Sequence, residues 1–559
     1  MKSPAPPSRA SSYCRLQPQQ TAKTRRGAIA VLAIAALLLS SQLVQAASRA
    51  ENIMEASCTG CHSRNEDGSW VRISDQRKSP EGWHMTLVRM RKAHGAELVD
   101  PAGGDELQTV RRLVRHLSRT QGLSPEETAP FRYVLEREFN TIENHDTVLF
   151  GEMCARCHSG ARVGLQRRSP DEWHHLVHFH LGQFPTTEYS LMGRDRDWLG
   201  IALEKMVPYL SQRFPLDSAS WDAWQESPRP ALDGRWRVAG RMPGRGQFSG
   251  HMTATPDGDN LALQFSGHFA GGGQLEGSGE ARIYNGYEWR ATLDLNAETW
   301  RQVFAATPGG DELEGRMFLR NRDEWGIRVR AVHDDAPPRL LAAYPGHLQR
   351  GTESEVTLLG SHLDDPEAIE LASGIEVLSA TVLDDDRIRL RIRADSDAEP
   401  GAYPITYAGQ PSEAALVVYN AIDRVEVEPA YAVARVGGNG GSQPVVDAMF
   451  DAVGIDVGVD GAAGTPDDLR IGVLSATWSV EPWDQRAAND RDVEFAGSMD
   501  EDSGVFHPGP AGPNPARQYE TNNAGNLLIV AEVADQGQTL RGEGQLIVTV
   551  QRWNNPPIR

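Results

Sequence analysis

The sequence predicts a multidomain chain in which an N-terminal all-α tandem repeat precedes three antiparallel all-β domains. Three observations lead to this prediction. Residues 77–84 (Arg-Lys-Ser-Pro-Glu-Gly-Trp-His) are echoed by residues 167–174 (Arg-Arg-Ser-Pro-Asp-Glu-Trp-His), which indicates an internal repeat. Helical periodicity stops near residues 227–230, and short alternating strands separated by Gly-rich turns follow. At 559 residues, the chain is also too long for a single core.

Each copy of the repeat starts a helix at a Ser-Pro pair. Serine is a favoured N-cap, proline suits the first helical position, and an acidic side chain in the first turn complements the helix dipole. At 3.6 residues per turn, one face of each helix carries Trp83, Leu87, Met90 and His94 in the first copy, and Trp173, Val177, His180 and Phe184 in the second. Aligning the tryptophans makes Met90 equivalent to His180.

Two CxxCH motifs precede these helices, at residues 58–62 and 154–158. CxxCH is the attachment signature of c-type haem, in which both thiols bond to the porphyrin and the histidine ligates the iron. A zinc ribbon or a disulfide is the alternative, but a ribbon needs closer cysteine pairs and no histidine after each pair. The sequence therefore predicts tandem cytochrome c lobes with two covalently bound haem c groups, attached through Cys58, Cys61, Cys154 and Cys157 and ligated by His62 and His158.

The sixth iron ligands are predicted from the equivalent helix positions. Thioether sulfur and imidazole are the usual sixth ligands of c-type haem, so the prediction is Met90 for the first haem and His180 for the second. The alternatives left open are core packing of Met90, ligation by Met85 or His94, and ligation by His174, His175 or His178. Methionine raises the haem potential relative to histidine, so we expect electrons to flow from the second haem to the first.

The amino-terminal 46 residues are typical of a cleaved signal peptide. They hold six Lys or Arg and no acidic residue, and an apolar run from Ala28 to Leu39 precedes Val44-Gln45-Ala46. That run is too short for a membrane span, so the sequence predicts export to the periplasm. The formal charge of −20 becomes about −26 without the leader, which argues against a nucleic-acid partner. Cys14 leaves with the leader, and no structural disulfide is expected.

Composition and periodicity divide the chain into six predicted segments. Helices are expected over about 107–117, at starts near Glu126, Glu143 and Pro170, and over about 197–214. A long Asp-, Asn- and Gly-rich stretch, residues 481–526, reads as a functional or disordered loop, and residues 456–468 read as an acidic hairpin turn or a calcium loop. The segments are a signal peptide (1–46), two cytochrome c lobes (47–122 and 123–228), a β barrel or sandwich (229–335), an immunoglobulin-like β domain (336–420) and a C-terminal β domain (421–559).

With these motifs and this domain order, the chain resembles the alpha subunit of quinohaemoprotein amine dehydrogenase. The residues that carry the resemblance are the two CxxCH motifs, the Ser-Pro-x-x-Trp pair and residues 178–183 (His-Phe-His-Leu-Gly-Gln). The resemblance implies a heterotrimer with a propeller beta subunit and a small gamma subunit that carries cysteine tryptophylquinone. It implies oxidation of a primary amine on that partner, with electrons passing through this chain to a periplasmic copper protein or cytochrome c. No catalytic residue is predicted here.

Two other classes of function remain open from the sequence. A self-sufficient dihaem peroxidase would need one haem with an open or displaceable coordination site. A secreted dihaem binding or sensory protein is also compatible with immunoglobulin-like domains, because fold does not determine function. The amine and the electron acceptor are not specified by the sequence.

Overall fold

The computed structural model describes residues 49–550 except 139, 185–186, 188–195 and 438–443, so the predicted signal peptide lies outside the described residues. The chain divides into two compact units. One comprises the described residues 49–74 together with Trp83–Thr120, and the other comprises Asp75–Gly82 and the described residues from 121 to 550. None of the helices in the described part is both long enough and apolar enough to cross a membrane.

The first unit is a small helical lobe. Residues 49–58 are helical and lead into the first CxxCH motif, followed by α2 (Pro80–His94, whose first three residues belong to the other unit) and α3 (Glu106–Thr120). On α2, Trp83 and Leu87 are buried and His94 is exposed. Helix α3 lies where periodicity predicted it, but its first apolar residue, Leu107, is 56% exposed.

Helices also form the amino-terminal part of the second unit. The predicted start near Glu143 is wrong by five residues, because Thr147 caps α5 by accepting a hydrogen bond from the Phe150 amide. The predicted last helix contains a π-helical turn, η2. The elements are α4 (Pro125–Thr128), η1 (Ala129–Val134), α5 (Val148–Cys154), α6 (Ala161–Gly164), α7 (Pro170–Gln183), α9 (Trp198–Ile201), η2 (Ala202–Met206), α10 (Val207–Arg213) and α11 (Ala219–Glu226).

A two-stranded ladder departs from the all-α prediction for this region. Strands β1 (Gln76–Lys78) and β2 (Gln166–Arg168) occupy equivalent repeat positions and pair antiparallel, with Arg77 opposite Arg167. The repeat symmetry extends beyond the strands: the Ser79 amide donates to the Leu165 carbonyl, and the Ser169 amide donates to the Asp75 carbonyl. Three-residue strands are too short to show periodicity in a sequence.

A buried carboxylate neutralises the two arginines of this ladder. Glu127 on α4 accepts hydrogen bonds from Arg77 Nη1 at 2.8 Å and Nη2 at 2.9 Å, and its Oε1 lies 3.2 Å from Arg167 Nε. Burial alone would raise the pKa of Glu127, but the two guanidinium groups hold it below its usual value. Glu127 also completes a capping box with Ser124. The Glu127 side chain thus stabilises both strands of the ladder, one from each repeat copy.

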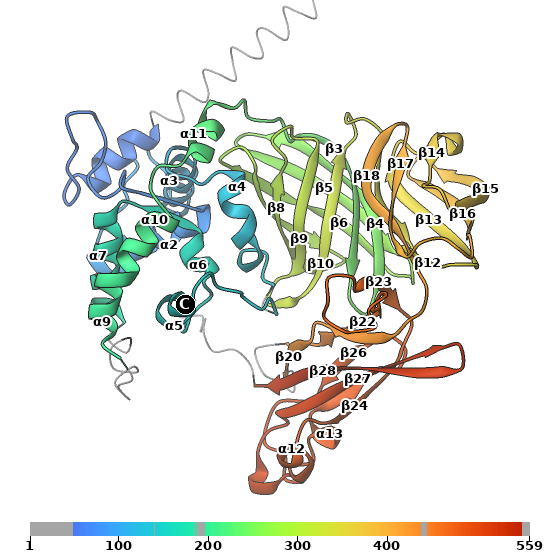
Figure 1. Ribbon diagram of the computed structural model, residues 1–559. Helices are drawn as coiled ribbons and strands as arrows, with labels where there is room; N and C mark the ends of the chain where they lie inside the picture. Colours follow the sequence, from blue (N-terminus) through green and yellow to red (C-terminus); the bar gives the residue numbers. More distant parts are fainter. Residues whose placement is uncertain (1–48, 139, 185–186, 188–195, 438–443, 551–559) are drawn as a thin grey trace, which may run out of the picture. The chain divides into compact units, whose positions relative to one another are not determined.

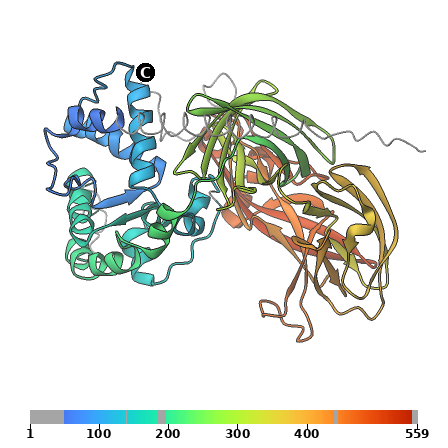
Figure 2. The same cartoon turned by 90° about the horizontal axis from the view of Figure 1, so that it is seen from above.

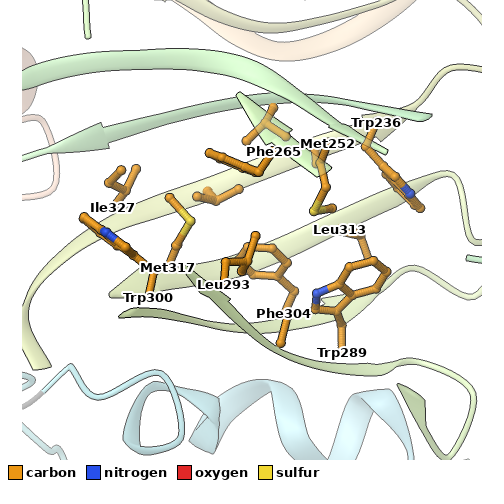
Figure 3. Close-up of a cluster of buried hydrophobic side chains, with 14 of the residues drawn as sticks. Trp236, Met252, Phe265, Trp289, Leu293, Trp300, Phe304, Leu313, Met317 and Ile327 are labelled. Carbon is orange, nitrogen blue, oxygen red and sulfur yellow. The ribbon is translucent and has the colours of Figure 1, made fainter. Parts of the chain in front are cut away.

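Residues from Gly234 to His333 form a closed eight-stranded barrel, which decides the barrel-or-sandwich alternative (green in Figure 1). Strand β10 pairs with β3 and so removes both sheet edges. Figure 3 shows large apolar side chains pointing toward one another inside the barrel, so its interior is a packed core, including Trp236, Met252, Phe265, Trp289, Trp300 and Phe304. The strands are β3 (Gly234–Met242), β4 (Gly246–Asp257), β5 (Asn260–Phe269), β6 (Gln274–Tyr284), β7 (Glu288–Leu295), β8 (Glu298–Ala306), β9 (Glu312–Leu319) and β10 (Arg322–His333).

The next domain is a sandwich of two four-stranded sheets, drawn yellow to orange in Figure 2. Its core is formed by alternating inward residues such as Val356, Leu358, Ile388 and Leu390. One pair, β12 with β18, is parallel, which departs from the all-antiparallel prediction. The sheets are β11 (Arg339–Tyr344), β13 (Glu353–Ser361), β16 (Arg387–Ala394) and β15 (Ile375–Asp384); and β12 (His347–Gln349), β18 (Gln410–Tyr419), β17 (Gly401–Tyr407) and β14 (Ile369–Glu370), with η3 at Pro366–Ala368.

The last domain contains three small sheets, and β20 pairs with β28 in parallel. Residues 481–526 are not a structureless loop: they form short elements held by a buried ion pair, in which Arg517 Nη2 lies 2.5 Å from Asp492 Oδ1. The strands are β19 (Arg424–Glu428), β22 (Asp451–Asp456), β23 (Leu469–Leu474), β20 (Tyr431–Arg435), β28 (Gln538–Thr549), β27 (Gly525–Asp535), β24 (Thr477–Pro482), β21 (Ala448–Met449), β26 (Val505–Pro508) and β25 (Gly497–Met499), with α12 (Gln485–Asn489), α13 (Asp492–Phe495) and η4 (Gln518–Glu520).

Candidate haem-binding sites

The first CxxCH motif forms a tight turn at the end of a helix. The Cys58 carbonyl accepts hydrogen bonds from the Cys61 amide at 3.1 Å and from the His62 amide at 2.9 Å. Both cysteines are free thiols; Cys58 is half-buried and Cys61 is exposed. Burial, reinforced by the charges of Cys61 and Glu55, raises the pKa of Cys58 to about 11. Cys58 is therefore a neutral thiol at neutral pH, and neither cysteine is in a disulfide, so both are available for thioether attachment.

The imidazole of His62 is oriented by a backbone acceptor. His62 Nδ1 lies 3.1 Å from the Val71 carbonyl oxygen, and the Val71 amide in turn donates to the Ser63 carbonyl at 3.0 Å. A hydrogen bond at Nδ1 sets the tautomer in which Nε2 carries the free lone pair. His62 can therefore present Nε2 to a haem iron.

The second CxxCH motif begins at the end of α5, and a backbone carbonyl orients its histidine as well. Cys154 is half-buried and Cys157 is exposed, and burial raises the pKa of Cys154 to about 12. His158 Nδ1 lies 3.0 Å from the carbonyl oxygen of its neighbour, Ser159. Its Nε2 is again left for a metal.

Helix α7 brings a second imidazole close to His158. His180 Nδ1 lies 2.7 Å from the Leu176 carbonyl oxygen, and its ring is flanked by Trp198 and Phe184 at centroid distances of 6.2 and 6.0 Å. Burial lowers the pKa of both His158 and His180, and the charge of His158 lowers that of His180 further. Each ring is therefore neutral at pH 7, the form that coordinates metals. Both rings can therefore offer Nε2 to a metal.

The alternative ligands lie elsewhere on the same helices. His174, His175 and His178 are exposed; the His174 and His178 rings pack together at 4.7 Å, and His175 Nδ1 lies 3.0 Å from Glu172. On α2, Met85 is 48% exposed and Met90 is half-buried. The assignments of Met90 and His180 as iron ligands stay predictions.

A carboxylate that the sequence analysis missed lies beside the second motif. Glu143 accepts hydrogen bonds from the Ser159 hydroxyl, the Tyr133 hydroxyl at 2.5 Å and the Gly160 amide at 2.7 Å. The sequence predicted only a helix start near Glu143 and did not mark its carboxylate as part of a site, because the fold brings its partners to it.

Carboxylates gather in two segments, the hairpin at residues 456–468 and residues 384–386. In the hairpin between β22 and β23, Asp467 accepts hydrogen bonds from the Val459 and Asp460 amides, and the calcium alternative stays a prediction. Within the described part of the chain, one group of carboxylates lies within 4.8 Å, Asp384–Asp386. Its charges are paired with Arg387 and with the buried Arg237.

Several solved structures resemble parts of the chain at low sequence identity. A redesigned β barrel, mFAP1, bound to DFHBI has 13% identity and a TM-score of 0.17, covering 18% of this chain and 94% of its own. Drosophila N-cadherin EC1-3 has 11% identity and a TM-score of 0.19, covering 44% and 85%. A Bacteroides ovatus mixed-linkage glucan protein, SGBP-B, has 13% identity and a TM-score of 0.18, covering 56% and 60%. These scores are too low to support an argument. No curated protein matches the chain.

Family models, in contrast, match nearly all of the described chain. Residues 48–221 match "Quinohemoprotein amine dehydrogenase A, alpha subunit, haem binding". Domain II of the same alpha subunit matches residues 229–334, domain III matches 337–420, and domain IV matches 425–558. The chain belongs to the family of quinohemoprotein amine dehydrogenase alpha subunits.

Proposed function

We propose that the chain is the dihaem electron-transfer and scaffold subunit of a periplasmic quinohaemoprotein amine dehydrogenase. The amine-oxidising site, with its cysteine tryptophylquinone, then lies on a small partner subunit, and a propeller subunit completes a heterotrimer. Electrons pass from the quinone through two covalently bound haem c groups of this chain to a periplasmic copper protein or cytochrome c. Family membership supports the proposal, because an alpha subunit is one part of a multi-subunit oxidoreductase.

The observation that carries the proposal is the common orientation of the imidazoles. His62, His158 and His180 each direct Nδ1 at a backbone carbonyl oxygen, at 3.1, 3.0 and 2.7 Å. Each therefore keeps Nε2 for a metal, and His158 lies close enough to His180 to lower its pKa. Histidines that served only in packing would not be expected to direct Nδ1 at a backbone carbonyl after both CxxC pairs.

The side chains of this chain have distinct tasks in the proposal. A haem iron supplies reversible one-electron transfer when it is bound. Cys58 and Cys61, like Cys154 and Cys157, tether the porphyrin, while His62 and His158 fix it from one side. Met90 and His180 would supply the remaining protein ligands of the two irons. If both proposed ligands held each iron, no position would remain for peroxide, so this ligand set would favour an electron relay over a peroxidase.

The β domains serve as the scaffold in this proposal. A soluble electron shuttle has no need of three additional domains, whereas a subunit that holds partners does. The proposed division is a cleaved signal peptide (1–46), cytochrome c lobes (47–122 and 123–228) and β domains (229–335, 336–420 and 421–559).

The native complex tests the proposal directly. Intact-mass measurement and pyridine haemochrome spectra are expected to give two covalent haems on this chain. Addition of a primary amine to the complex is expected to reduce both haems, whereas addition to the isolated chain should reduce neither. Covalent haem without amine-dependent reduction, or peroxide turnover by the isolated chain, would contradict the dehydrogenase assignment and favour the peroxidase.

A further inference from the structure

Glu143 lies directly behind the loop that carries the second motif histidine. It is reached from three segments: Tyr133 on η1, Ser159 after the CxxCH motif, and the first residues of α6. Partial burial opposes ionisation of Glu143, but hydrogen bonds from Ser159, Tyr133 and the Gly160 and Ala161 amides hold its pKa below the usual value. The side chain is thus a carboxylate at neutral pH.

The hydrogen bonds of Glu143 fix the group that orients His158. His158 Nδ1 is 3.0 Å from the Ser159 carbonyl, and Glu143 binds the hydroxyl of that same serine. Glu143 Oε2 also accepts from the Gly160 amide at 2.7 Å, which takes the place of the side-chain cap that α6 lacks. A Cβ on Gly160 would lie 3.2 Å from Glu143 Oε2 and 2.9 Å from His145 Cε1, so glycine permits the close approach.

The first motif uses a different support. There the acceptor for His62 is the Val71 carbonyl, and the Val71 amide is held by the Ser63 carbonyl. A backbone carbonyl therefore orients the histidine of each motif. The segment that carries this carbonyl is held by a backbone hydrogen bond in the first lobe and by an ionised carboxylate in the second.

We propose that Glu143 is a positioning residue for His158 and that its charge lowers the reduction potential of the second haem relative to the first. The inference rests on the proposed dihaem function. A fixed negative charge near a haem favours the ferric over the ferrous state, and hydrogen bonding around a ligand histidine strengthens its bond to iron. Glu143 would then help to set the direction of electron flow, from the second haem to the first.

The test is Glu143→Gln in the full-length chain with both haems attached, with Glu152→Gln as the charge-matched control. Glu152 is an exposed carboxylate of the same lobe, on α5, paired with Arg196 at 2.6 Å. Spectroelectrochemical titration is expected to show a positive shift of the second haem in Glu143→Gln. The first haem, and both haems of Glu152→Gln, should keep their potentials. The low-spin EPR signal of the second haem is expected to change in Glu143→Gln alone.

Unchanged potential and EPR signal in a fully loaded Glu143→Gln protein would overturn the inference, as would equal shifts of both haems. If Glu143→Gln fails to retain the second haem, Glu143→Asp tests the positioning role instead. This variant keeps the negative charge on a side chain that is one methylene group shorter. A second haem identical to the wild type in that variant would overturn the positioning role; a changed EPR signal would support it. A wild-type chain without a second covalent haem would instead defeat the proposed function itself.

Discussion

The two repeat copies share their helix caps and a buried tryptophan, and they differ at the positions predicted to ligate iron. Ser79 and Ser169 cap equivalent helices by accepting from amides three residues on, at 3.2 and 3.3 Å, and Trp83 and Trp173 are both buried. In contrast, Met90 stands where the second copy has His180. The acceptors for the motif histidines also differ. The two copies therefore share caps and core, which determine whether the lobe folds, and differ at the positions predicted to ligate or orient a ligand of iron.

The largest expected effect concerns the shared ladder. Glu127→Gln removes the charge that compensates Arg77 and Arg167 and leaves two buried guanidinium groups without it. Breaking a buried ion pair from one side costs about 3–5 kcal/mol. Urea unfolding followed by tryptophan fluorescence should show a loss of this size. Glu126→Gln, at an exposed position, is the control and should change the urea midpoint little. An unaltered midpoint in Glu127→Gln would show that this carboxylate does not stabilise the ladder.

A second comparison concerns the acidic residue in the first turn of each helix. Glu81 lies 2.6 Å from Arg290 on β7, whereas its counterpart Asp171 is exposed. Arg290 also lies beside a second carboxylate, Glu288. Burial raises the pKa of Glu288 to about 8, although the positive charge of Arg290 opposes this rise. Between about pH 4.5 and 8 the unfolded chain gives up this proton and the folded chain keeps it, so stability falls as pH rises.

Glu288→Gln should therefore flatten the pH dependence of stability across this window. The expected difference is a few kcal/mol at most, since each pKa unit corresponds to about 1.4 kcal/mol. Melting temperatures measured between pH 5 and 9 provide the test, with Asp171→Asn as the control that keeps the wild-type slope. Parallel slopes for wild type and Glu288→Gln would show that Glu288 is ionised in the folded state.

The difference between Met90 and His180 predicts the next effect. Replacing His180 by Met should raise the potential of the second haem by on the order of 0.1 V, within the range of about 0.8 V that axial ligands cover. For one electron this is about 2 kcal/mol. Redox titration measures it, and Met90→His should lower the potential of the first haem.

His175→Met on the exposed face of α7 is the control for this exchange and should leave both potentials unchanged. If His180→Met has no effect while a substitution of His174 or His178 does, the sixth ligand has been assigned to the wrong histidine.

The smallest effect concerns the helix caps. Ser79→Ala and Ser169→Ala each remove the side-chain acceptor at a helix start, and each should cost about 1 kcal/mol. Thermal unfolding of the two variants compares the copies directly, with Ser→Thr at each position as the control that retains a hydroxyl. Unequal losses would show that the caps of the two repeats are not equivalent.

Local patterns predicted the helix starts at the two Ser-Pro pairs well and long-range pairing poorly, whereas the haem ligands stay predictions. A Ser-Pro pair or a CxxCH turn is encoded within five residues, so neighbouring sequence suffices. Alternation is the same in a barrel and a sandwich, and only the pairing of β10 with β3 distinguishes them. The parallel pair β20 with β28 joins residues more than a hundred positions apart, and Glu143 meets Ser159 only after folding.

The sequence by itself determined the tandem repeat, the four cysteines with their histidines, and the change from helices to alternating strands. Each of these is a statement about residues near one another in the chain. Only the tertiary structure decided that β3–β10 close into a barrel, that Glu127 serves both repeat arginines, and that His158 has Glu143 behind its supporting carbonyl. The physical reason is that strand register, charge compensation and hydrogen-bond acceptors are supplied by segments distant in sequence, whose approach is settled by burial of the whole core.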